Sequence, residues 1–126
     1  MSHFHNHSTN LESLIKDIPT YEDAVKITDI LQILSDPTRL RILWLLCHTT
    51  ECVLDIGLAI GMSSPAVSHH LKQLKKANII QSKKVGKEMQ YTLADNSYAK
   101  LIHSLIEDML EITCPNQSNR IGGNFK

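Results

Sequence analysis

The sequence predicts a mainly α-helical fold with one small β-hairpin, arranged as a winged helix-turn-helix. The first observation is a short apolar segment, residues 54–62, followed by an amphipathic segment that starts at Ser64. Gly61 separates the two segments and is suited to the left-handed conformation that closes a helix. The second observation is a pair of short strand-like runs within residues 79–93, on either side of a turn at Gly86. The third is a concentration of lysines in the second helix and the hairpin.

The N-terminal part of the chain predicts an arm and two helices. Residues 1–10 are polar and rich in histidine, and we expect them to form a flexible arm. Residues 11–17 are expected to form a short helix. Residues 20–34 predict a clearer one, because Thr20 is suited to the N-cap and apolar side chains then recur on one face: Ala24, Ile27, Leu31 and Leu34.

The segment from Thr38 to Cys47 carries the heaviest apolar content, and Pro37 fits the first turn of the helix that it predicts. A helix this apolar should be buried on most sides and form the centre of the core. Its apolar run, residues 42–47, is too short to span a bilayer. Because the N-terminus is polar and unlike a signal peptide, we expect a cytoplasmic protein with no membrane partner.

The segment that starts at Ser64 predicts a helix with two unlike faces. Val67, Leu71 and Leu74 form one apolar stripe, and the rest of the surface is polar. Ser63 or Ser64 can cap its first turn. Short polar side chains near the N-terminus of such a helix can reach base edges in a DNA major groove, and lysines further along can reach phosphates.

The charge distribution supports the same interpretation. The whole chain is formally neutral, but residues 63–92 contain six lysines and one acid, Glu88, which gives a local charge of +5. A local basic patch is sufficient for docking on a polyanion. We therefore predict double-stranded DNA as the partner, with base contacts from Ser64, Pro65, Ser68 and His69, phosphate contacts from Lys72, Gln73 and Lys75, and groove contacts from the wing residues Lys83, Lys84 and Lys87.

Residues 98–112 predict a last helix. Its apolar side chains are more numerous than packing against its own domain requires: Leu101, Ile102, Leu105, Ile106, Met109 and Leu110. We expect a second copy of the chain to cover part of this helix, which gives a homodimer through terminal helices. A dimer also presents two recognition helices about one DNA turn, roughly 34 Å, apart. The alternative is that the helix packs only on its own domain. The ordered domain is expected to span residues 11–113, with a flexible tail at 114–126.

Three cysteines form an odd count, which argues against a disulfide framework and leaves free thiols, a metal site or a redox switch. The sequence contains no Gly-rich phosphate loop, nucleophile elbow or metalloprotease helix motif. We therefore do not expect an enzyme.

Three motifs resemble the ArsR/SmtB family of small winged-helix repressors. They are LSDPTRLRIL at residues 34–43, AVSHHL at residues 66–71 and KVGKEMQYTL at residues 84–93. The resemblance implies a homodimer that binds palindromic operator DNA and leaves it when an inducer, most often a metal ion, binds. It does not identify the inducer, because members of the family place their sensing sites at several positions on this fold.

The resemblance places one such site at the start of the helix-turn-helix, where the family motif is E-L-C-V-(C/G)-D-L. Cys52 and Asp55 match two ligand positions, and three residues apart they would share one face of a helical turn. Leu54 replaces the second cysteine of the thiol-rich members, and one residue is missing after Glu51. In the family the N-terminal arm of the other subunit completes the site, which here indicates His3, His5 and His7.

One thiolate, one carboxylate and imidazoles suit Zn(II) or a similar divalent ion such as Co(II). The single thiol argues against selectivity for arsenic, lead or cadmium. The same residues also have structural explanations: Cys52 as a small buried hydrophobe, Asp55 as a helix cap, and the histidines as part of the arm.

A second family site lies on the last helix, across the dimer interface. Its positions are occupied here by Asp95, Ser97, Asp108 and Glu111. Ser97 and Asp108 replace the two histidines that the family prefers there. Three carboxylates without imidazole would bind more weakly and prefer harder ions. They are equally explained as helix-end and surface charges.

A third possibility is a thiol sensor, because some family members detect persulfides or oxidants with cysteines near the positions of Cys47 and Cys114. A disulfide there would need the two Cα atoms within about 7 Å. Core packing explains Cys47 as well, and no basic residue flanks either thiol closely. A constitutive DNA-binding protein with no inducer also remains open.

Overall fold

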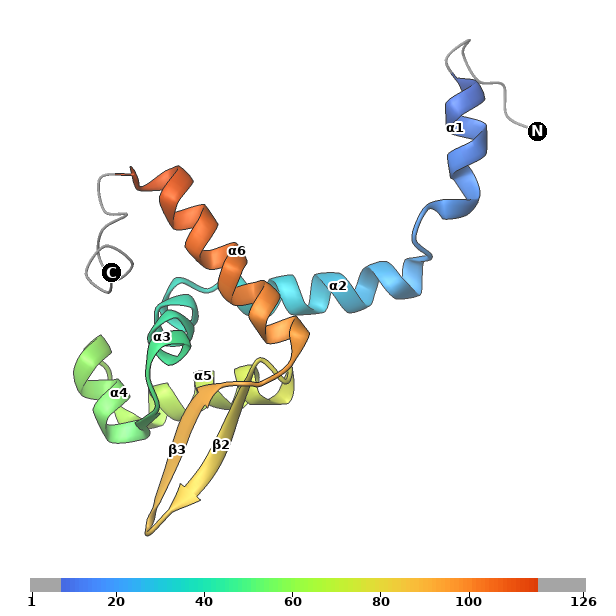
Figure 1. The fold of residues 1–126 in the computed structure, drawn as a ribbon. Helices are drawn as coiled ribbons and strands as arrows, with labels where there is room; N and C mark the ends of the chain where they lie inside the picture. The colour runs from blue at the N-terminus through green and yellow to red at the C-terminus, as the bar shows by residue number, and fades with distance from the viewer. Residues whose placement is uncertain (1–7, 116–126) are drawn as a thin grey trace. The chain divides into compact units, whose positions relative to one another are not determined.

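The computed structural model describes residues 8–115 of the 126-residue chain (Figure 1). The chain divides into two compact units, residues 1–32 and 33–126. None of the helices in the described part is long and apolar enough to cross a membrane.

The first unit is helical. It contains α1 (Ser8–Leu14), a 3₁₀ turn (Ile15–Asp17) and most of α2 (Tyr21–Leu34). The hydroxyl of Thr20 accepts a hydrogen bond from the Asp23 backbone N–H at 3.1 Å, which confirms Thr20 as the N-terminal cap of α2. Because α1 begins at Ser8, it takes in the last three residues of the expected arm, while His3, His5 and His7 lie outside the described residues.

The described part of the second unit contains four complete helices: α3 (Pro37–His48), α4 (Val53–Ile60), α5 (Ser64–Lys76) and α6 (Ser97–Thr113). Three of them begin at a polar side chain that accepts a hydrogen bond from a backbone N–H three residues later. These caps are Asp36 for α3, Ser63 for α5 and Asn96 for α6. Local sequence therefore sets where these helices start.

A three-stranded antiparallel sheet flanks the helix-turn-helix in sequence: β1 (Glu51–Cys52) precedes α4, and β2 (Ile80–Val85) and β3 (Glu88–Leu93) follow α5. The strand order in the sheet is β1-β3-β2. The hairpin between β2 and β3 was predicted, and Gly86 occupies its turn with a φ of 64°. The short strand β1 was not predicted, because a strand of two residues shows no periodicity. It forms by pairing with Gln90 and Tyr91, which lie far away along the chain.

The core of the second unit centres on α3, as predicted. Ile42, Leu43 and Leu46 are at most 1% exposed. The predicted stripe of α5, Val67, Leu71 and Leu74, is also fully buried, so that the opposite face of α5 is fixed toward solvent. Helix α6 covers the core with Ala99, Ile102 and Ile106.

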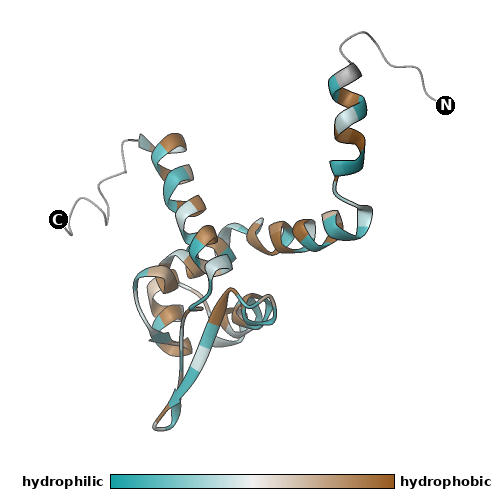
Figure 2. Ribbon diagram, turned by 45° about the vertical axis from the view of Figure 1, so that its right-hand side comes forward, coloured by the Kyte–Doolittle hydropathy of each residue, from teal (hydrophilic) through white to brown (hydrophobic). Residues whose placement is uncertain are grey.

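Other apolar side chains of α2 and α6 remain exposed, and Figure 2 shows hydrophobic residues recurring along both helices. On α6 the exposed stripe consists of Leu101, Leu105, Met109 and Ile112, and α2 buries none of its residues. Helix α6 therefore has one face for its own domain and a second apolar face that remains exposed among the described residues.

Gly57 in α4 should tolerate no larger side chain. A Cβ atom there would stand 2.7 Å from the backbone oxygen of Met62, in the turn before α5. Because a backbone atom would have to move, we expect Gly57→Ala to lower the free energy of unfolding by roughly 1–3 kcal/mol, measured by urea denaturation. The exposed Ala59→Ser in the same helix should change it by less than about 0.5 kcal/mol. Equal stability of the two variants would refute the close contact.

Candidate nucleic-acid interface and metal-ligating residues

The turn between α4 and α5 fixes how the polar face of α5 is presented. Gly61 has a φ of 83°, and the backbone N–H groups of Gly61 and Met62 both donate to the oxygen of Gly57, at 2.8 and 2.9 Å. This is the left-handed helix end that the sequence predicted at Gly61. Ser63 then caps α5 by accepting a hydrogen bond from the Ala66 N–H at 3.4 Å.

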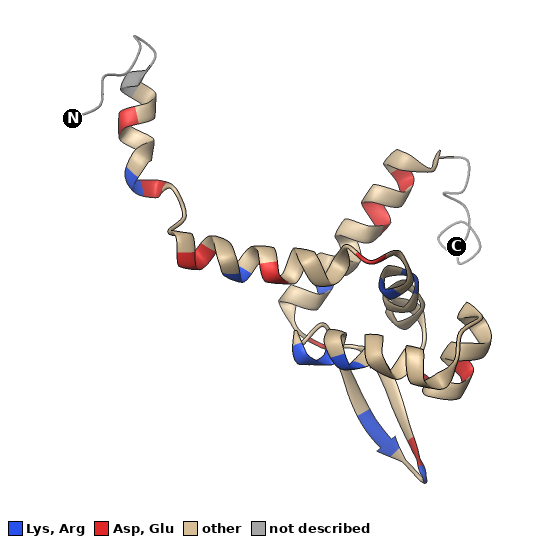
Figure 3. Ribbon diagram, turned by 180° about the vertical axis from the view of Figure 1, so that it is seen from behind, with Lys and Arg blue, Asp and Glu red and all other residues tan. Residues whose placement is uncertain are grey.

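The predicted DNA-contacting residues lie on α5 and the hairpin, where Figure 3 shows Lys and Arg positions along both elements. Of the ten, Gln73 is half-buried and the rest are exposed: Ser64, Pro65, Ser68, His69, Lys72, Lys75, Lys83, Lys84 and Lys87. Within residues 8–115 none of these lysines forms an ion pair. Their charges are therefore available to phosphates.

The register of the hairpin separates the wing lysines. Lys83 pairs with Gln90 and Lys84 with Met89 across β2 and β3. Since successive side chains of a strand point to opposite faces, Lys83 and Lys84 face opposite sides of the wing. Lys87 lies in the turn beside Gly86. The wing thus presents positive charge on both faces and at its tip.

His70 is half-buried and forms a hydrogen bond within the protein. Its Nδ1 accepts a hydrogen bond from Arg39 Nε at 3.3 Å, and Arg39 Nη1 donates to the backbone oxygen of Ile33 at 3.1 Å. Burial lowers the pKa of His70, which favours the neutral imidazole that accepts this bond. The hydrogen bond from the Arg39 backbone lowers the pKa of Asp36, the cap of α3. His70 therefore braces α5 against the start of α3.

At the metal site expected at the start of the helix-turn-helix, the conformation of Cys52 differs from what the sequence indicated. Cys52 does not lie on a helical turn with Asp55: it is the extended N-cap residue of α4 and part of β1, because its backbone pairs with Gln90. Its side chain is buried at 9% exposure, whereas Asp55 is exposed in the first turn. The histidines expected to complete the site, at positions 3, 5 and 7, lie outside the described residues.

The residues of the second expected metal site are spread along α6 and the residues just before it. Asp95 precedes the helix and pairs with Lys100 at 3.4 Å, while Asp108 and Glu111 are exposed in its last turns. The helical rise separates Ser97 from Asp108 by about 16 Å. These positions could therefore share an ion only if a second chain supplied part of the set.

The two cysteines of the redox alternative have different surroundings. Cys114 is exposed at the end of α6, and Cys47 is half-buried at the end of α3. Burial, and secondarily the negative charge of Glu107, raise the pKa of Cys47 to about 12. Because the thiolate is the reactive form, this environment argues against Cys47 as an oxidant sensor near neutral pH.

The structure brings together a group that the sequence reasoning missed. His48, His103 and Glu107 have ligand atoms within 4.8 Å of one another, and they form a group of three potential metal ligands in the described part of the chain. The spacing of His103 and Glu107, one helical turn apart, is visible in the sequence. His48 lies just beyond the helix expected from Thr38 to Cys47 and far from α6 along the chain, so that only the packing of α3 against α6 reveals its proximity.

Comparison with known proteins agrees with this geometry. A family model described as "Bacterial regulatory protein, arsR family" matches residues 36–82, from the cap of α3 into β2. A "Transcriptional repressor SmtB homolog" of Synechocystis is 28% identical over 105 residues, covering 83% of this chain and 80% of the relative. The "Cadmium resistance transcriptional regulatory protein CadC" of Listeria innocua is 41% identical over 70 residues, covering 55% of this chain and 59% of the relative.

A solved structure shares the fold. It is described as the homodimeric winged helix-turn-helix DNA-binding domain Mb0332 of Mycobacterium bovis, a possible ArsR-family transcriptional regulator. The likeness has a TM-score of 0.63 at 19% sequence identity and covers 90% of this chain and 94% of the other. The predicted winged helix-turn-helix is thereby confirmed.

Proposed function

Because this chain belongs to the ArsR family of bacterial regulatory proteins, a family of DNA-binding transcription regulators rather than enzymes, we propose that it acts as a homodimeric repressor. It binds operator DNA through α5 and the wing, and it leaves the DNA when a divalent metal ion binds. The observation that carries the DNA-binding part is the exposed polar face of α5 beside a basic wing whose lysines form no ion pair within the described residues.

The homodimer is supported by the uncovered apolar stripe of α6. Leu101, Leu105, Met109 and Ile112 recur along one side of the helix and are between 43% and 78% exposed. A stripe of this kind on a soluble protein indicates a partner surface. The related Mycobacterium bovis domain, described as homodimeric, supports a second copy of the chain as that partner.

The metal response is supported by the relative whose name refers to cadmium resistance and by the residue types at the expected site that includes Cys52 and Asp55. In the proposal, Cys52 and Asp55 of one subunit and the arm histidines His3, His5 and His7 of the other hold Zn(II) or a similar divalent ion. The ion would have to bind more tightly to a dimer geometry that does not match the operator, because a ligand shifts an equilibrium only by its differential affinity.

The test is fluorescence anisotropy with labelled DNA from upstream of the chain's own gene and with random duplex, under reducing conditions, during a titration with zinc chloride. Without metal, we expect the chain to prefer the upstream DNA. Zinc should raise the apparent Kd of the wild type at least about tenfold. The Cys52→Ser variant should retain DNA binding and lose most of this tenfold response to zinc.

Two results would count against the proposal at different points. Equal affinity for upstream and random DNA would reject a sequence-specific repressor. A preference for upstream DNA that zinc leaves unchanged would keep the repressor and remove the metal response.

A further inference from the structure

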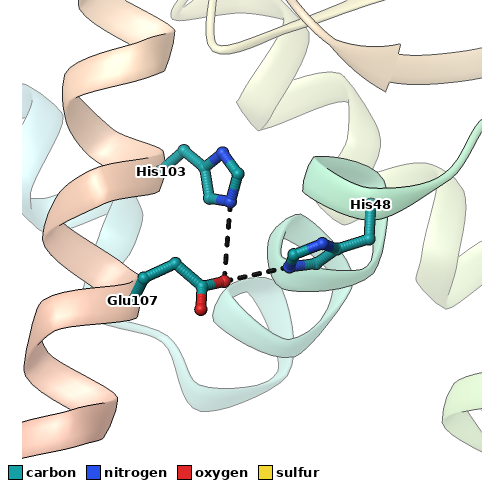
Figure 4. Close-up of side chains that lie close together, drawn as sticks. All are labelled: His48, His103 and Glu107. Atoms are coloured by element: carbon teal, nitrogen blue, oxygen red, sulfur yellow. Dashed lines mark hydrogen bonds and ion pairs between the residues drawn. The ribbon is translucent and has the colours of Figure 1, made fainter. Parts of the chain in front are cut away.

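Two histidines and one glutamate, outside both metal sites expected from the sequence, lie together between α3 and α6. His48 is the last residue of α3, and His103 and Glu107 stand one turn apart on α6. Figure 4 shows the three side chains directed toward one another. We propose that this group is a binding site for a divalent transition-metal ion and that Zn(II) and Co(II) are ions that fit it.

The distances within the group suit such an ion. His48 Nε2 lies 2.9 Å and His103 Nε2 lies 3.5 Å from the same carboxylate oxygen, Oε1 of Glu107. Ligands placed tetrahedrally about 2.1 Å from a zinc ion are themselves about 3.4 Å apart. The observed distances lie on either side of this value, so that small side-chain rotations would open the group around an ion.

The imidazole of His48 is held in place before any ion binds. The ring of Trp44, one turn earlier in α3, lies against it with a centroid distance of 4.5 Å. The ring of His103 meets it edge-on at 5.2 Å and an interplanar angle of 89°. A site whose ligands are already ordered loses less conformational entropy on binding than one that must assemble them.

The group is sheltered but can be reached from solvent. Its side chains are 19%, 31% and 39% exposed for His48, His103 and Glu107 respectively. Two imidazoles and one carboxylate form a borderline ligand set typical of zinc sites in which water takes the fourth position. This donor set contains no thiolate, which distinguishes it from a site that uses Cys52.

An ion here would connect two parts of the protein with different tasks. His48 ends α3, immediately before the connection to β1, and β1 pairs with β3 of the wing. His103 and Glu107 belong to the helix that carries the exposed apolar stripe. The ion would therefore couple the position of the wing to the dimerisation helix, an effect that rests on the proposed function. The binding of the metal itself does not depend on that function.

The test is a titration of the full-length chain with Co(II), followed by visible absorption, and then displacement by Zn(II). We expect the d–d bands of a tetrahedral cobalt site that persists in the Cys52→Ser variant, without thiolate charge-transfer absorption. His103→Gln and Glu107→Gln should each weaken binding to this site at least about 100-fold, because each removes a direct ligand. Ser104→Ala, an exposed neighbour on the same helix, should bind cobalt as the wild type does.

A nitrogen-15 spectrum of the histidine side chains provides a readout that a purely structural role would not change. Zinc should shift the Nε2 resonances of His48 and His103 together. Far-ultraviolet circular dichroism of the two Gln variants establishes that they are folded, and having two independent variants guards against a folding defect in either one.

The outcomes separate the site from the proposed function. Cobalt binding lost in Cys52→Ser would overturn the site, and so would cobalt binding that both His103→Gln and Glu107→Gln leave unchanged in the Cys52→Ser background. So would a loss confined to Glu111→Gln, which would assign the ion to the far end of α6. Operator binding by the metal-free wild type is measured in parallel: its absence, with cobalt bound as expected, would reject the repressor and leave the site standing.

Discussion

Replacing Lys72, Lys75 and Lys84 together by Gln is expected to weaken binding to any DNA duplex about 100-fold at about 0.15 M salt. All three side chains are exposed on α5 and the wing and form no ion pair within residues 8–115. Each lysine that neutralises a phosphate releases a counterion, so that the slope of log affinity against log salt should fall by about 3. Anisotropy titrations on operator and random DNA at several salt concentrations measure both quantities.

Ser68→Ala provides the matched contrast, because it changes the same helix face without changing its charge. Ser68 is exposed near the N-terminal end of α5, where side chains can reach base edges. Its loss should reduce the preference for operator over random DNA and leave the salt slope unaltered. If the lysine variant loses affinity only for the operator, or if Ser68→Ala weakens both duplexes equally, the assignment of phosphate and base contacts is wrong.

Introducing Leu105→Glu and Met109→Glu into α6 is expected to convert the proposed dimer into monomers. These side chains are 43% and 53% exposed and lie in the apolar stripe, away from the core that Ile102 and Ile106 fill. By two-fold symmetry each substitution occurs twice at the interface, and each places an unpaired charge in it. Because a monomer engages only one half-site, operator affinity should fall by a factor between about 10² and 10⁴.

Sedimentation velocity measures the change in mass, and circular dichroism tests whether the monomer remains folded. Ser104→Glu is the control, since it adds a glutamate to an exposed polar position next to Leu105. It should leave the sedimentation coefficient unchanged. A Leu105→Glu, Met109→Glu protein that still sediments as a dimer would show that the stripe of α6 is not the interface.

The environments of individual residues show why part of the candidate site could be predicted and part could not. The buried stripe of α5 and its exposed polar face follow from a period of 3.6 residues, which the sequence displays directly. The conformation of Cys52 was predicted wrongly, because its backbone pairs with Gln90, far along the chain, and this pairing extends the residue just before α4 begins. A pattern within a few residues contains no information about such a partner.

The sequence by itself determined the helices, their caps, the turn at Gly61, the hairpin around Gly86 and the basic face of α5 and the wing. Each of these depends on residues within about one or two turns of each other, so that the local order of side chains specifies them. The tertiary structure alone decided three further features: the strand β1, the bracing of His70 by Arg39, and the meeting of His48 with His103 and Glu107. These depend on how α3 packs against α5, α6 and the sheet, and packing places side chains together that no spacing along the chain relates.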